Sequence, residues 1–379
     1  MSPTPIDLLV RAGRVFCADT DLDGPGAVAV RGDRIVAAGP KIETPAAVEL
    51  DFPDALLLPG LIDMHAHPDR GFSRYGVDPD VHFLHRGVTT VLSQGDAGAS
   101  NWPGYRDQVI GACRTRVLLA LNLSTLGESH PQSCFPDIEA ADVEACVATI
   151  KSADEGIWGI AVNTGPSNPT PPHEILDRAL AAAERTAKPL LVGPRLIEDW
   201  PLEDQLPLLR PGDVVTYCLN NFPESIVRDG KIRPPVWTAR ERGVLFDVGH
   251  GMQSFHFDVA QAAIADGFLP DTVSTDQYKR HVGSSPQHDL PRTLSKLIAV
   301  GMPENEAFAR ATARPAELLG LQGEIGTLRP GACADLAVLR WNEAALPLQD
   351  VHGGLRPGGC WEPITTIRAG QLVGCHKSL

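Results

Sequence analysis

The chain has 379 residues, of which 43% are hydrophobic, so it is long and apolar enough to bury a substantial core. Its 47 acidic side chains outnumber its 33 basic ones, and the net charge of -14 repels phosphate backbones, which argues against nucleic-acid binding. The sequence shows no signal peptide, no apolar run near the about 20 residues of a membrane span, and eight cysteines without a Cys-x-x-Cys pair, which predicts a reduced, cytoplasmic protein without membrane contact.

Both ends of the chain read as short strands broken by Gly- and Asp-rich turns. These β-prone runs are 8–10, 27–30, 34–38, 334–339 and 364–368. Because two all-β ends flank one middle, we expect residues 1–58 and 327–379 to meet in a small β-sandwich domain.

The middle of the chain, residues 59–326, alternates short apolar runs with stretches of helical periodicity, clearest at 172–186 and 259–266. The apolar runs are 61–66, 88–93, 117–123, 157–162, 189–193, 213–218, 244–248 and 271–274. Strands that alternate with helices form a parallel sheet, and eight of them close a barrel. We therefore predict an α/β fold with a (β/α)8 TIM barrel over 59–326.

The carboxyl ends of barrel strands carry active groups, and four polar side chains fall there. His65 and His67 end the first run, and because alternate residues of a strand share a face, both imidazoles enter the barrel mouth. Asp276 ends the eighth run, and Asp96 follows the second. Two imidazoles and a carboxylate suit Zn²⁺ or a similar divalent ion and leave a position for water, whose pKa the ion would lower.

At these positions the sequence resembles the amidohydrolase superfamily, and within it the deacetylase or dihydroorotase-like branch. The matching segments are PGLIDMHAH at 59–67, GVTTV at 87–91, STD at 274–276 and GTLRPGACADL at 326–336. The closer likeness to the branch lies in LRPGD at 209–213 and ARERGVLFDVGHGMQS at 239–254. The resemblance covers the chain from about residue 8 and implies a metal-dependent hydrolase in a barrel.

The sequence departs from the pattern of the branch at the second metal site. Members of the branch usually hold two metals bridged by a carboxylated lysine, and the matching position here is Ala161. Gly193 and Tyr217 stand where the branch places two further histidines. A methyl group and a hydrogen cannot coordinate metal, and a neutral phenol is a poor ligand, so we expect a single divalent ion: Zn²⁺ first, with Mn²⁺ or Fe²⁺ as alternatives.

Several roles near this site stay open. Asp276 is our candidate general base, and a purely structural ligand is its alternative. Tyr217 is either a donor to a developing oxyanion or an aromatic wall. Asp96 either joins the ligands, orients water or caps a turn, while Cys218 is expected to point away from the barrel mouth because it follows the inward Tyr217.

The resemblance also suggests substrate contacts. His250 stands in the Gly-His-Gly of the branch, where it would line the pocket. Asn163 replaces an arginine with which relatives hold a substrate carboxylate, and Arg195 or Arg280 is expected to take over that task. The superfamily often forms dimers, which makes a homodimer our expectation.

Three functions remain in competition. The first is a mononuclear hydrolase of an amide, lactam or ester bond in a small molecule. The second is a decarboxylase, lyase or isomerase that uses the same metal without adding water. The third is a metal-free binding protein, against which the retention of His65, His67 and Asp276 together argues.

Overall fold

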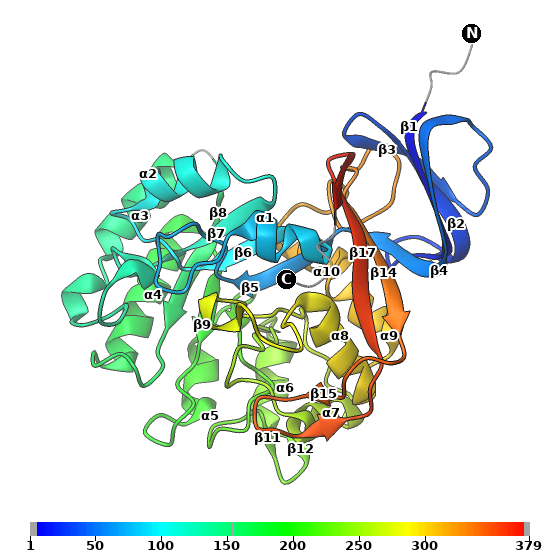
Figure 1. The fold of residues 1–379 in the computed structure, drawn as a ribbon. Coiled ribbons are helices and arrows are strands. Elements are labelled where there is room, and N and C mark those ends of the chain that lie inside the picture. The colour runs from blue at the N-terminus through cyan, green and yellow to red at the C-terminus, as the bar shows by residue number, and fades with distance from the viewer. Residues whose placement is uncertain (1–5, 154, 375–379) are drawn as a thin grey trace.

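The computed structural model describes residues 6–153 and 155–374, and its centre is a parallel sheet of seven strands (Figure 1). The strands run in sequence order around the sheet, each parallel to its neighbours. They are β5 (Leu61–Ala66), β6 (Val88–Gln94), β7 (Arg116–Asn122), β8 (Ile157–Asn163), β9 (Leu190–Gly193), β10 (Val214–Val215) and β13 (Leu245–Phe246). Every residue of β5 and β6 is buried, as expected for parallel strands covered on both faces.

The eighth predicted strand is not a regular strand, yet it closes the sheet. Segment 271–277 forms parallel bridges to both edges, between Asp247 and Thr272 on one side and between Ala66 and Gln277 on the other. The buried carboxylate of Asp63 accepts hydrogen bonds from the Thr275 amide at 3.0 Å and hydroxyl at 2.5 Å. The fold is therefore TIM-barrel-like, as predicted, with a closing segment held by side-chain as well as backbone bonds.

Helices lie outside this sheet, and the predicted helix at 172–186 is present with those bounds. It buries one face, including Ile175, Ala179 and Ala183, which recur at helical spacing. The α-helices are α1 (Pro79–His82), α2 (Trp102–Tyr105), α3 (Val143–Ser152), α4 (Pro172–Thr186), α5 (Leu202–Gln205), α6 (Pro234–Glu241), α7 (Phe257–Ala265), α8 (Leu290–Ala299), α9 (Glu304–Ala309) and α10 (Ala313–Leu318). None of the helices in the described ranges is long and apolar enough to cross a membrane.

The two ends of the chain meet, as predicted, but in one mixed sheet of seven strands with the order β18-β17-β14-β4-β1-β2-β3. Its strands are β1 (Ile6–Cys17), β2 (Leu22–Arg31), β3 (Arg34–Gly39), β4 (Ala46–Pro59), β14 (Leu336–Asn342), β17 (Cys360–Arg368) and β18 (Gln371–Gly374). Two short hairpins, β11 (Val227–Arg228) with β12 (Lys231–Ile232) and β15 (Leu348–Gln349) with β16 (Leu355–Arg356), lie apart from it. The predicted two-sheet sandwich is not confirmed, and the sequence analysis missed β4, which joins the N-terminal and C-terminal strands.

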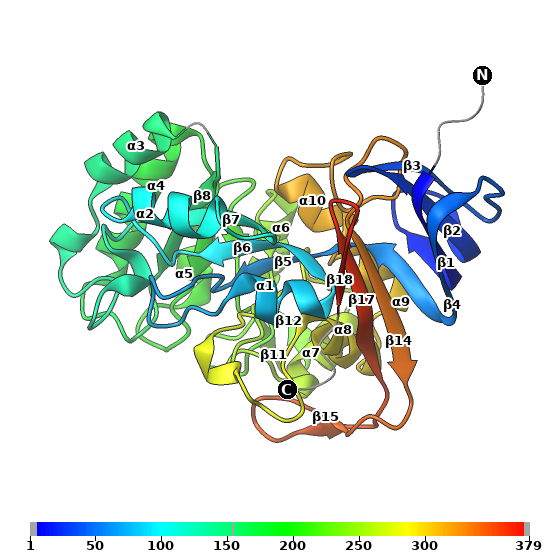
Figure 2. The ribbon, with the colours of Figure 1, turned by 45° about the horizontal axis from the view of Figure 1, so that its top comes forward.

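The terminal sheet packs beside the barrel along α8 and α9 (Figure 2). The Trp361 amide on β17 donates to the Ser295 hydroxyl on α8 at 2.9 Å, and the Trp361 ring contacts Phe308 on α9. At the junction, the Gly60 amide donates to the Asp335 carbonyl, and a side chain at Gly60 would collide with Thr89. The domain boundaries at 58/59 and 326/327 stay a prediction, and their outer limits, residues 1–5 and 375–379, lie outside the described residues.

Candidate metal centre

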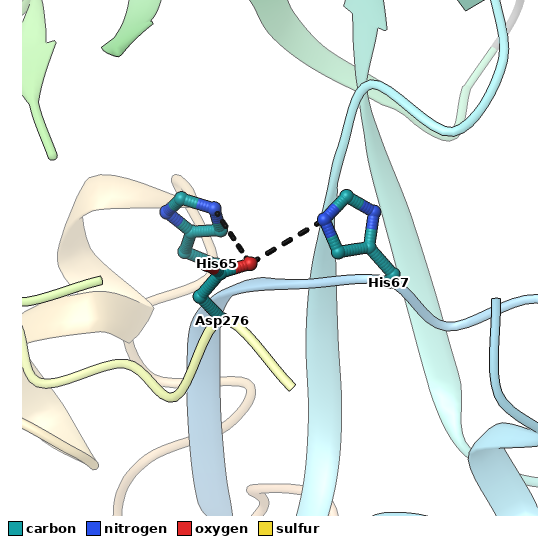
Figure 3. A group of neighbouring side chains, drawn as sticks. All are labelled: His65, His67 and Asp276. Carbon is teal, nitrogen blue, oxygen red and sulfur yellow. Dashed lines mark ion pairs between the residues drawn. The ribbon is translucent and has the colours of Figure 1, made fainter. Parts of the chain in front are cut away.

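Three predicted ligands converge at the carboxyl end of the barrel (Figure 3). The Asp276 carboxylate oxygen Oδ1 lies 3.5 Å from Nε2 of His65 and 3.4 Å from Nε2 of His67. All three residues are buried, and one ligand atom of each lies within 4.8 Å of the others. Backbone hydrogen bonds hold the two segments side by side: the Asp276 amide donates to the His65 carbonyl, and the His67 amide donates to the Gln277 carbonyl.

In both rings Nδ1 already has a hydrogen-bond partner, which leaves Nε2 free to bind a metal. His65 Nδ1 lies 2.7 Å from the Thr216 hydroxyl, which itself donates to the buried carboxylate of Asp247 at 2.8 Å. The Thr216 oxygen therefore accepts from Nδ1–H, and the Nε2 lone pair of the neutral His65 ring faces Asp276. Such outer bonds fix the tautomer and orientation of ligating histidines. The donor set of two imidazole nitrogens and one carboxylate fits a divalent ion.

The charges of the three converging side chains depend strongly on one another. Burial is the largest single influence and opposes the charged imidazole, but Asp276 and Asp247 together outweigh it and raise the pKa of His65 to about 9. Against the same cost of burial, Asp96 and Asp276 raise the pKa of His67 well above its usual value. The two rings in turn lower the pKa of Asp276 although burial alone would raise it. A metal ion must therefore displace protons from the histidines when it binds.

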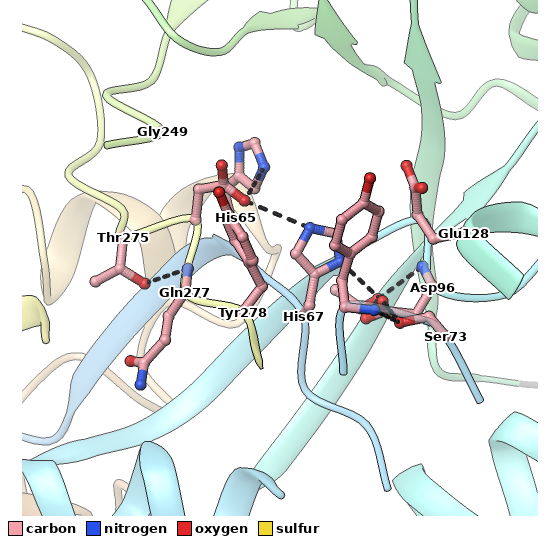
Figure 4. A network of polar contacts seen from close by, with 12 residues as sticks. His65, His67, Ser73, Asp96, Glu128, Gly249, Thr275, Gln277 and Tyr278 are labelled. Carbon is pink, nitrogen blue, oxygen red and sulfur yellow. Dashed lines mark hydrogen bonds and ion pairs between the residues drawn. The ribbon is translucent and has the colours of Figure 1, made fainter. Parts of the chain in front are cut away.

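Asp96 lies behind His67 and outside the converging group (Figure 4). Its Oδ1 accepts from His67 Nδ1 at 2.8 Å and from the Ser73 hydroxyl at 2.7 Å, and its Oδ2 accepts from the Ser93 hydroxyl at 2.7 Å. Both oxygens are thus engaged on the side of the ring away from Asp276. This geometry favours an orienting role for Asp96 over the predicted ligand role.

The positions of the absent second-site ligands are filled by other side chains. A side chain built at Gly193 would lie 3.1 Å from both Asn163 and Tyr217, so these two residues occupy the space. Ala161 is fully buried in β8 and offers only a methyl group. Among the described residues no further His, Cys, Asp or Glu joins the group of three, and Cys218 is buried outside it.

A cavity of about 300 Å³ opens beside Asp276 and is lined by Tyr217, Asn163 and Tyr278 among others. The Tyr217 hydroxyl lies 3.4 Å from His65 Nε2, and the residue adopts a positive φ of 62°, which turns its ring toward the histidine. Burial and the charge of Asp276 raise the pKa of Tyr217 well above its usual value. The phenol therefore stays protonated and can donate a hydrogen bond into the cavity.

The remaining predicted substrate contacts do not all reach this cavity. Arg195 pairs with Asp199, its Nε lying 2.9 Å from Oδ1, and Arg280 is exposed on the 3-10 turn 279–281. Neither arginine is among the described residues that line the cavity. His250 lines a neighbouring cavity instead, with Nε2 2.8 Å from Lys296 Nζ and Nδ1 2.8 Å from the Gly251 carbonyl.

Sequence reasoning missed two buried ionisable groups near the centre. Glu128 follows β7 and lies close to His67 (Figure 4), and burial raises its pKa. Lys296 lies on α8, where burial lowers its pKa to about 7. Glu128 and Lys296 cannot be recognised as site residues from their sequence neighbours, because only the tertiary fold brings them to the site.

The sequence and the fold are both similar to those of known proteins. Residues 254–373 match the model of the amidohydrolase family. A deacetylase of Agrobacterium fabrum is 33% identical over 92% of this chain and 87% of its own length, and a deacetylase of Enterococcus faecalis is 30% identical over 97% and 98%. Crystal structures of an adenine deaminase (TM-score 0.88, 28% identity, 97% of this chain and 100% of that one) and a dihydroorotase (TM-score 0.85, 27% identity, 97% and 98%) share the fold.

Proposed function

Because this chain belongs to the amidohydrolase family and is a hydrolytic enzyme that acts on C–N bonds, we propose that it deacylates a small amide at a single-metal centre. Its curated relatives are named deacetylases, which makes an acetyl group the first choice for the acyl part. The ion is a divalent metal bound by His65, His67 and Asp276, with Zn²⁺ preferred over Mn²⁺ or Fe²⁺.

The observation that carries the proposal is the arrangement of the two imidazoles. Both Nε2 atoms face the same Asp276 oxygen, while both Nδ1 atoms are held by Thr216 and Asp96. Asn163 and Tyr217 fill the space beside Gly193 that a second set of ligands would need, which supports one metal. The family membership favours hydrolysis over the alternatives of a lyase and of a metal-free binding protein.

A divalent ion held here would supply Lewis acidity, which polarises a carbonyl and lowers the pKa of water. Asp276 lines the cavity, and as a metal ligand it would be a carboxylate at neutral pH. It can therefore accept a proton from the attacking water and deliver it to the leaving nitrogen. Its backbone bonds to β5 hold the carboxylate in place for both transfers.

Tyr217 is the candidate donor to the carbonyl oxygen of the substrate. Its phenol is neutral, lines the same cavity as Asp276, and lies on the side of His65 Nε2. A fixed donor aimed at a developing oxyanion stabilises the transition state more than the ground state. Asn163 offers an amide at the cavity wall, where the resemblance led us to expect an arginine.

The test is metal content together with the fate of solvent oxygen. The full-length protein loaded with Zn²⁺, Mn²⁺ or Fe²⁺ should hold one ion per chain, and His67→Ala should lose it while the exposed His352→Ala keeps it. With N-acetylated amino acids in ¹⁸O-labelled water, the released acetate should carry the label. Two ions per chain would contradict a single-metal centre, and turnover without label would contradict hydrolysis.

A further inference from the structure

A second cavity, of about 270 Å³, lies next to the metal centre on the other side of loop 249–252. Its wall includes His250, His288, Arg292 and Lys296, and it shares Met252 with the cavity at Asp276. Arg292 and Lys296 come from α8, and Gln349 of β15 and the two residues after it line the same cavity. None of the catalytic roles assigned above uses this cavity.

Two basic side chains on its wall form no direct ion pair. Lys296 is only 6% exposed, and Arg292 precedes it by one helical turn on the same face of α8. Within the described residues no salt bridge with an N–O distance of 4.0 Å or less joins the side-chain nitrogens of Lys296 or Arg292 to a carboxylate, and the buried Nη1 of Arg292 has no hydrogen-bond partner. Buried charges in proteins are normally paired, so the ammonium form of Lys296 and the buried Nη1 of Arg292 both call for a partner.

The nearest acidic side chains are already committed. Asp350 accepts hydrogen bonds from the amides of Phe257, His352 and Gly354 at 2.7 to 3.0 Å. Asp289 pairs with Arg86, whose Nε lies 2.9 Å from its Oδ2, and caps α8. Asp350 lines the cavity and both carboxylates act on Lys296 from a distance, but neither forms an ion pair with Lys296 or Arg292.

The imidazoles of His250 and His288 add no negative charge to the cavity wall, and they leave hydrogen-bond donors of Lys296 and Arg292 free. The Nε2 of His250 takes one hydrogen bond of Lys296 at 2.8 Å, since Nδ1 of the same ring donates to the Gly251 carbonyl. The His288 ring donates to the Thr275 carbonyl at 2.9 Å. An ammonium has three donors, so two of Lys296 remain alongside those of Arg292 Nη1.

We propose that this cavity is a binding site for a small oxyanion, a carboxylate or phosphate group, held by Lys296 and Arg292. The planar guanidinium and the ammonium supply charge-assisted hydrogen bonds that match the several acceptor oxygens of such a group. The source is either an acidic end of the substrate or a separate small anion. Gly251 lies between the two cavities, since it lines this one and a Cβ there would lie 2.4 Å from Asp276 Oδ2.

The first experiment titrates inorganic phosphate into the full-length, metal-loaded protein by calorimetry. Binding that persists in His67→Ala belongs to this cavity and not to the metal centre. Lys296→Met should weaken phosphate binding at least about tenfold, and Lys296→Arg should restore it because the charge returns. Lys188→Met, at a half-buried lysine that lines a cavity elsewhere in the barrel, should leave the affinity unchanged.

Arg292→Gln provides a second variant that removes a charge without opening the core, and it too should weaken phosphate binding. Equal affinity in wild type, Lys296→Met and Arg292→Gln would overturn the proposal, as would no phosphate binding by wild type at millimolar concentration. Phosphate binding does not depend on the proposed deacylation, so it can be observed even if the protein shows no deacylase activity.

The second experiment separates the two sources and rests on the proposed function. If the anion is the acidic end of the substrate, phosphate competes with an N-acetylated amino acid, and Lys296→Met raises KM for the acid but not for its neutral amide. If the anion is a separate molecule, phosphate changes turnover without competing. Both results support the site.

Discussion

Replacing Asp96 by asparagine separates an orienting role from a ligand role. An asparagine keeps the shape, its oxygen can still accept from His67 Nδ1 and Ser73, and its amide can donate to the Ser93 hydroxyl. Only the charge is lost. A charge-assisted hydrogen bond is worth about 1.5–3 kcal/mol and a neutral one about 0.5–1.5 kcal/mol, so the expected cost is about 1–1.5 kcal/mol.

That cost predicts about a tenfold loss of Zn²⁺ affinity in Asp96→Asn, in line with the effect of removing outer partners of metal-bound histidines. Competition with a chromophoric chelator at fixed pH measures it. Asp142→Asn, which removes a carboxylate that caps the distant α3, serves as the control and should leave affinity unchanged. A loss of more than about a thousandfold would mean that Asp96 binds the metal directly and would refute the geometry described here.

Three further outcomes follow from the charges at these sites. Because the pKa of His65 is raised to about 9, its ring is protonated below that pH when no metal is bound. Zn²⁺ affinity, measured by chelator competition, should therefore weaken as pH falls from 9 to 6. The expected loss is up to about tenfold per pH unit for each displaced proton. Tyr217→Phe should lower kcat about 100-fold with little change in KM, as steady-state assays of acetate release would show. The pKa of Lys296 falls from 10.5 to about 7, so the unfolded chain binds more protons between these values and stability rises with pH. Lys296→Met should therefore raise the free energy of unfolding by about 2–4 kcal/mol at pH 7 and low phosphate, and by less as pH approaches 10.5, in urea titrations.

The barrel and the convergence of His65, His67 and Asp276 could be predicted from the sequence. Strand periodicity places His65 and His67 on one face, and parallel strands bring their carboxyl ends together, so Asp276 had to meet them. The absence of metal-binding groups at Ala161 and Gly193 could also be predicted, because a residue without a donor atom in its side chain cannot bind metal through it in any fold. These conclusions depend on local pattern and on chemistry that does not change with the surroundings.

What lies behind and beside those three side chains could not be predicted from the sequence and follows from the tertiary structure. It placed Asp96 on the outer nitrogen of His67, turned His250 toward Lys296 in a second cavity, and kept Arg195 and Arg280 away from the cavity at Asp276. It also merged the two ends of the chain into one sheet through β4 instead of the expected sandwich. Which side of a ring a loop residue reaches depends on the path of segments far apart in the sequence, and residue spacing does not encode that path.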